Sequence, residues 1–267
     1  MWIARLLPEG TSRYASAATL FKSLDWIMDY RPLEWFTPWI IFAAGVGWRK
    51  AVADRYFFWD FSNWGLEVAV ALIFGVGFAW FLKNNDTLPI DRQLENPLRG
   101  FTLYLGIGIV LFLVGWFGNP LTGLAVGYPY FLSILAIMAI FMIPLGKDEK
   151  DSYKILDHKK RISFSAFSFG LSVLVVAIGF MQDEPVISTA AAVYALFPLA
   201  SLIAPHPRHV RRARLYSVFI FGFFISMRAP WLLIMMFVHF HGMRFYNYFR
   251  HGIVSPTLII EAKEDQR

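Results

Sequence analysis

Histidine and arginine side chains concentrate on both sides of the last long apolar run of the sequence, Tyr216–Phe240. We name this set the basic shelf: His206, His209, Arg211, Arg212 and Arg214 before the run, and His239, His241, Arg244, Arg250 and His251 after it. Guanidinium groups bind phosphate and carboxylate oxygens through charge-assisted hydrogen bonds. Beside a membrane, such a set predicts a surface for lipid phosphates or for an acidic partner.

Two other functions are compatible with the same residues. An enzyme that acts on a phosphorylated lipid could use one of four histidines as acid or base, provided that they share one pocket: His206, His209, His239 or His241. The spacing of the two histidine pairs also allows metal ligation, but no pattern of carboxylates completes such a site. We therefore predict no catalytic residue and no metal site, and keep the lipid enzyme as an alternative.

The same apolar run contains a charge and a helix breaker, because its middle reads Ser-Met-Arg-Ala-Pro-Trp. An arginine at mid-bilayer costs at least about 2.5 kcal/mol, and Pro230 removes a helical hydrogen bond. We expect a re-entrant hairpin with Arg228 at its turn, or else a seventh crossing helix. Glu67 is the first candidate partner of Arg228, followed by Asp183 and Glu184. Alternatively, the arginine extends to the interface or caps a helix end.

A third group of charges lies in the segment Lys83–Pro97, which contains Asp86, Asp91, Arg92 and Glu95. The carboxylates could hold a cation or meet a basic partner. A solvated connection between two apolar runs explains them as well, and we favour it.

The composition predicts that membrane-spanning helices carry these groups. Apolar residues make up 57% of the chain and charged residues 16%, against roughly a quarter charged in soluble domains. Trp39, Trp48 and other aromatic residues flank the apolar runs, which predicts interfacial belts, with buried core positions as the alternative. A crossing helix needs about 20 apolar residues, and six runs approach this length: Leu33–Trp48, Trp64–Leu82, Arg99–Phe117, Thr122–Leu145, Ser163–Met181 and Ile187–Ala204.

Positive charge predicts the orientation, since Lys and Arg gather on the side that is not translocated. With the last run as a hairpin, 21 of the 25 Lys and Arg residues fall inside and three outside, whereas a single crossing gives 17 and seven. We therefore prefer the hairpin, with both termini cytoplasmic. The turns Gly118–Leu121 and Gln182–Val186 are short, which predicts antiparallel neighbours.

The chain contains no cysteine, which excludes disulfides, thiolate metal sites and a thiol nucleophile. It has no phosphate-binding glycine loop and no histidine at the centre of an apolar run for haem ligation. We predict no cofactor. Glycines recur within the runs, as in Gly45-Val46-Gly47, and we expect them to let helices of this chain approach closely.

The chain divides into three parts. Residues 1–32 carry apolar positions at helical spacing over Ala17–Met28, behind a possible N-cap at Thr11. This predicts an amphipathic helix that lies in the interface or packs on the protein's own loops. Residues 33–204 form the six-helix bundle, and residues 205–267 form a basic segment, the broken hairpin and a short tail.

The sequence thus predicts an all-α integral membrane protein with about six transmembrane helices and a C-terminal re-entrant hairpin or seventh helix, in a bacterial-type inner membrane. By elimination, the leading predicted function is a non-enzymatic subunit or scaffold of a secretion, conjugation or energy-transducing assembly. Its expected partners are anionic lipid headgroups and other membrane proteins, but not nucleic acid, because the net charge of +6 is spread over loops. A small lipid or solute transporter with a cavity around Arg228 and the interfacial lipid enzyme are the alternatives.

Overall fold

The computed structural model describes residues 2–30, 32–52, 54–62, 64–84, 97–147 and 153–254. In these ranges the chain is all-α apart from an antiparallel hairpin of β1 (Leu145–Lys147) and β2 (Tyr153–Ile155). Four short elements come first: α1 (Trp2–Leu6), α2 (Ser12–Lys22), α3 (Asp25–Met28) and the 3-10 helix η1 (Pro32–Trp35). The eight long helices among the described residues are α4 (Phe36–Ala51), α5 (Trp64–Asn84), α6 (Pro97–Trp116), α7 (Pro120–Phe141), α8 (His158–Met181), α9 (Pro185–Ile203), α10 (Pro207–Ser226) and α11 (Pro230–His251).

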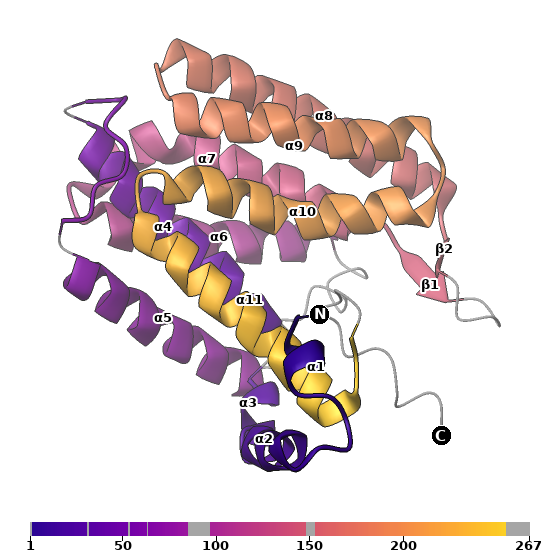
Figure 1. The fold of residues 1–267 in the computed structure, drawn as a ribbon. Helices are drawn as coiled ribbons and strands as arrows, with labels where there is room; N and C mark the ends of the chain where they lie inside the picture. The colour runs from indigo at the N-terminus through magenta and orange to yellow at the C-terminus, as the bar shows by residue number, and fades with distance from the viewer. Residues whose placement is uncertain are drawn as a thin grey trace.

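Helices α4 to α9 correspond to the six predicted runs. Their ends agree with the predicted ends to within five residues. The pairs α6–α7 and α8–α9 are antiparallel neighbours joined by short turns, as the sequence predicts (Figure 1).

The C-terminal part differs from the expectation. Residues 207–215, part of the basic segment expected between the bundle and the last run, form the first half of α10. Val210 and Ala213 are buried on one side of this helix, and Arg208, Arg211 and Arg212 are exposed on the other. Of its arginines, only Arg214 is partly buried, on the packed side. The last run is therefore divided between two helices of 20 and 22 residues, about 30 Å and 33 Å long, that meet at a turn of residues 227–229.

Successive long helices run in opposite directions, so the bundle has two ends (Figure 1). We call one the basic end, which carries the N-terminal helices, the β-hairpin, the α9–α10 turn and the last residues of α11. The opposite, or turn, end carries residues 54–62 and the turns after α6, α8 and α10. Of the described Lys and Arg residues, those at the turn end are Arg49, Lys50, Arg55 and Arg228.

Helix α4 is the central helix of the bundle. Twelve of its sixteen residues are buried, and it contacts α5, α6, α10 and α11. Trp39 and Trp48, predicted for interfacial belts, are only 5% and 1% exposed and belong to the hydrophobic core. The alternative of buried core aromatics is therefore the correct one for these two residues.

Helices α4 and α6 cross backbone to backbone. A Cβ atom added at Gly45 would collide with the carbonyl oxygen of Phe112, and one added at Gly115 would collide with that of Phe42. Glycine permits this approach because it has no side chain. The expectation that glycines pack helices within this chain is confirmed at this crossing, whereas Gly77 faces open space.

The N-terminal segment packs against the last helix. The hydroxyl of Tyr248 donates to the carbonyl oxygen of Leu7 at 2.7 Å, and that of Tyr14 donates to the carbonyl oxygen of Tyr248 at 3.3 Å. Arg250 donates to both carboxylate oxygens of Asp25 at 2.7 and 2.6 Å. These hydrogen bonds hold the pKa of the Asp25 carboxyl below its ordinary value, which keeps the pair ionised at neutral pH. These bonds join the N-terminal segment to α11, although no residue of α1, α2 or α3 is buried. Its place in the membrane interface stays a prediction.

The glycine crossing gives a matched test, because two helical glycines, Gly115 in α6 and Gly77 in α5, face different surroundings. We expect Gly115→Ala to lower the free energy of unfolding by about 1–3 kcal/mol through overpacking. Gly77→Ala should leave it unchanged or raise it by up to about 1 kcal/mol, because alanine is the better helix former. Thermal unfolding of both variants in mild detergent measures the difference, and equal midpoints would contradict the crossing.

Candidate functional site

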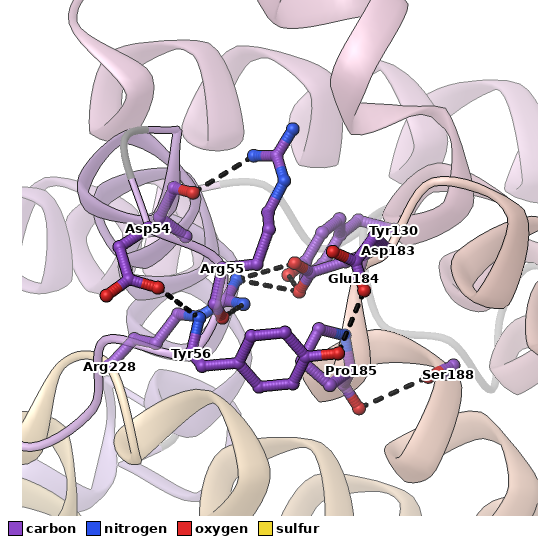
Figure 2. A network of polar contacts seen from close by, with 10 residues as sticks. Asp54, Arg55, Tyr56, Tyr130, Asp183, Glu184, Pro185, Ser188 and Arg228 are labelled. Carbon is purple, nitrogen blue, oxygen red and sulfur yellow. Dashed lines mark hydrogen bonds and ion pairs between the residues drawn. The ribbon is translucent and has the colours of Figure 1, made fainter.

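A buried ion pair joins two turns at the turn end of the bundle. Nη1 of Arg228, in the α10–α11 turn, donates to both carboxylate oxygens of Glu184 at 2.8 and 2.7 Å. Glu184 is the residue before α9, in the α8–α9 turn. The two side chains are 2% and 0% exposed. Nη2 of Arg228 donates to the carbonyl oxygen of Arg55 at 2.7 Å, so residues 54–62 join the same network (Figure 2).

Further hydrogen bonds extend this network to other elements. The Tyr130 hydroxyl, from α7, donates to Glu184 Oε1 at 2.8 Å. The Tyr56 hydroxyl donates to Asp183 Oδ1 at 2.9 Å, which joins residues 54–62 to the α8–α9 turn (Figure 2). The backbone N–H of Trp59 donates to the carbonyl oxygen of Met227 at 2.7 Å. A buried charge is stable only when its partners are in place, so the network holds α7 and three connecting segments together.

Glu67 is not the partner of Arg228. It forms a second cluster with Lys50, whose Nζ lies 2.9 Å from Glu67 Oε1 and 3.0 Å from Asp60 Oδ2. The Trp231 indole N–H donates to Glu67 Oε2 at 2.7 Å. Glu184, which the sequence offers only as a later candidate, holds Arg228 because the α8–α9 and α10–α11 turns meet at the same end of the bundle.

Residues of the basic shelf that precede the run have mainly structural contacts. The His206 ring accepts from the N–H of Arg208 and so caps α10. Arg214 donates to the carbonyl oxygens of Phe141 and Ile143 at 3.1 and 2.5 Å, at the end of α7. Arg211 lies 4.0 Å over the ring of Tyr153. The side chains of Arg208, Arg212, Lys159 and Lys160 are exposed at the basic end.

His239 stands near the middle of α11, although it lies at the end of the predicted apolar run. It does so because α11 continues eleven residues beyond the apolar run. Its Nε2 lies 2.7 Å from the carbonyl oxygen of Pro32, and its ring contacts Trp35 and Phe36 at centroid distances of 5.3 and 4.7 Å. His239 therefore joins η1 to α11.

The four histidines do not gather in one place. His206 and His209 lie at the start of α10, His239 lies against η1, and the His241 ring packs on Phe237. Within the described ranges, no group of three His, Asp or Glu side chains is placed to hold a metal ion. The acids Asp86, Asp91 and Glu95 and residue Arg92 lie outside the described residues.

The bundle contains a partly open apolar cavity of about 320 Å³. Residues from η1, α4, α5, α6, α7, α9 and α10 line it. Near the basic end its wall contains Glu34, Thr37 and Phe141, and near the turn end it contains Tyr130 and Ile225. Nearly all other lining side chains are aliphatic or aromatic, among them Ile41, Phe78, Ile107, Leu111, Phe112, Phe131, Ile134, Ile137, Met138 and Phe221.

Tyr130 connects the cavity with the ion pair. Its ring lines the cavity, while its hydroxyl donates to Glu184. Arg228 is not among the residues that line this cavity. The cavity residues come from seven elements, and none of them has a sequence signal that distinguishes it from core.

The length and hydropathy of the helices define a class of protein. Within the described residues, the helices long and apolar enough to cross a membrane are α5, α7, α8 and α9, and α6 contains a shorter apolar stretch, Phe101–Trp116. An all-α chain of this kind fits an integral membrane protein. No protein-family profile, curated protein or solved structure matches this chain.

The buried ion pair predicts a large effect of a single substitution. Arg228→Met should lower the free energy of unfolding by about 3–5 kcal/mol, because Glu184 remains buried without its partner. The double variant Arg228→Met/Glu184→Gln should recover part of this loss. Thermal or denaturant unfolding in mild detergent measures both, with Arg208→Met, at an exposed position, as the control. A loss no greater than that of the control would show that the pair does not hold the turns.

Proposed function

We propose that this chain is an integral membrane protein that binds the long apolar chain of a lipid inside its helix bundle. The observation that carries the proposal is the cavity of about 320 Å³ between α4, α6, α7 and α10. Ligand pockets commonly measure roughly 300–1,000 Å³, so the cavity is large enough for a ligand chain.

The chemistry of the wall selects the ligand class. Long aliphatic and aromatic side chains offer dispersion contacts to methylene or isoprenoid units. A hydrophilic solute or an ion would need several polar groups along its path, and the cavity offers few, such as Ser133 and Ser217. An acyl or isoprenoid chain therefore fits better than a polar solute, and among the transport alternatives the lipid is favoured.

The distribution of charge supports an orientation for this protein. Only Arg49, Lys50, Arg55 and Arg228 of the described basic residues lie at the turn end. Two of the four are held in ion pairs. Because basic segments stay on the cytoplasmic side, we place the basic end and both termini there. The eight long helices then cross the bilayer in alternation, and the exposed basic residues face anionic headgroups.

A subunit of a membrane assembly is the second candidate function. The observation that favours it is the outer side of α5, where Leu66, Ile73 and Val76 are 72%, 69% and 70% exposed. Such a side could pack on another membrane protein as well as on lipid. Copurification of the native protein with a fixed partner would support this role. The interfacial enzyme has lost its main support, because its four histidines lie apart.

Filling the cavity should prevent lipid binding. Ile137 lines the cavity, so we expect Ile137→Trp to reduce labelling by a photoactivatable diazirine fatty acid about tenfold, through loss of space for the chain. The matched control, Leu174→Trp, changes a 46% exposed side chain on α8 and should label like the unmodified protein. Cross-linked peptides identified by mass spectrometry give the result. Full labelling of a folded Ile137→Trp variant, judged by its unfolding midpoint, would contradict the proposal.

The orientation has a direct test because the chain contains no cysteine. Single cysteines replace Lys159 and Arg212 at the basic end, and Phe61 and Met227 at the turn end. In intact cells, a membrane-impermeant maleimide should label the turn-end cysteines only. After permeabilisation it should also label the cysteines at the basic end. Labelling at position 227 separates two full crossings by α10 and α11 from a re-entrant hairpin, in which this residue would be protected. The reverse pattern would invert the topology.

A further inference from the structure

The geometry points to a second lipid site, separate from the bundle cavity: a groove between α10 and α11 that binds an acyl chain of an anionic phospholipid, with the headgroup phosphate at Arg244. The groove has a volume of about 510 Å³. Its lining residues are Phe219, Ile220, Phe223, Phe224, Leu233, Met236, Phe237, Phe240 and His241. The bundle cavity uses a different side of α10, with Ser217, Val218, Phe221 and Ile225.

The groove exists because α10 and α11 diverge. The two helices meet at the turn of residues 227–229 and separate toward the basic end (Figure 1). They remain close at Gly222, where an added Cβ would lie 2.5 Å from the sulfur of Met236. On the outer side of this contact, Phe223 and Phe237 are 53% and 62% exposed, so the groove is open on the outside of the bundle, where lipid chains lie.

The dimensions of the groove match one leaflet. From Leu233 to Arg244 the helix advances eleven residues, or about 16 Å. Half of a bilayer hydrocarbon core is about 15 Å. An acyl chain that begins at Arg244 would therefore end near the turn side of the groove, with its headgroup toward the basic end.

The polar end of the groove selects an anionic headgroup. Arg244 lies one turn beyond Phe240, with its guanidinium carbon 5.8 Å from the centre of that ring. Its Nε is buried and makes no hydrogen bond to any described residue. His241 lies one turn before it, with Nδ1 3.0 Å from the carbonyl oxygen of Phe237. A phosphate oxygen would accept a hydrogen bond from the guanidinium group. The phosphate of a zwitterionic headgroup does so less well, because the cation of that headgroup competes with Arg244 for it.

Photo-crosslinking to a defined lipid tests this site. The full chain is placed in phosphatidylcholine vesicles that contain a small fraction of phosphatidylglycerol with a diazirine on its acyl chain. The parallel probe carries the same acyl chain on phosphatidylcholine. We expect phosphatidylglycerol to label the groove peptides of α10 and α11 several-fold more than phosphatidylcholine does, and Arg244→Gln to remove this excess.

The control variant is Lys159→Gln, which removes one positive charge at the same end of the bundle, on α8. It should keep the preference for phosphatidylglycerol. Equal labelling by the two probes would mean ordinary annular lipid and would overturn the proposal, as would an undiminished preference in Arg244→Gln. Adducts on Val218 or Phe221 report the bundle cavity instead, so the two lipid sites succeed or fail separately.

Discussion

A charge that leaves water must find an opposite charge and enough hydrogen bonds, and this constraint organises the turn end of the bundle. Arg228 and Glu184 meet at full burial, where either one alone would be costly. Their pair holds the α10–α11 turn against the α8–α9 turn, and the carbonyl oxygen of Arg55 adds the segment 54–62. Helix α10 ends and helix α11 begins at this fixed point, and the two helices diverge from it toward the basic end.

Tyr130 connects the ion pair with the interior of the bundle. This side chain must present its hydroxyl to Glu184, which places its ring at one end of the apolar cavity. At the α4–α6 crossing, glycines at 45 and 115 bring the two helices into backbone contact. Close packing at this crossing and larger side chains elsewhere leave space between α4, α7 and α10, because helices that touch at one point separate away from it.

Part of the candidate site could be predicted from the sequence and part could not. An arginine within an apolar run signals a buried partner, and Arg228 has one. The choice among Glu67, Asp183 and Glu184 depended on which turns meet in space, information that no local pattern contains. His239 was read as part of a basic surface, but it lies in an aromatic setting against η1, because α11 extends past the run that hydropathy marks.

The sequence by itself determined the all-α class, the positions of α4 to α9 and the gathering of Lys and Arg toward one end, since these depend on run length and composition along the chain. The tertiary structure decided three further features. It made residues 207–226 a full amphipathic helix, it determined which charged side chains form pairs, and it determined where the cavity and the groove lie. These features arise from side chains far apart in the chain, and their energies depend on distances that exist only after packing.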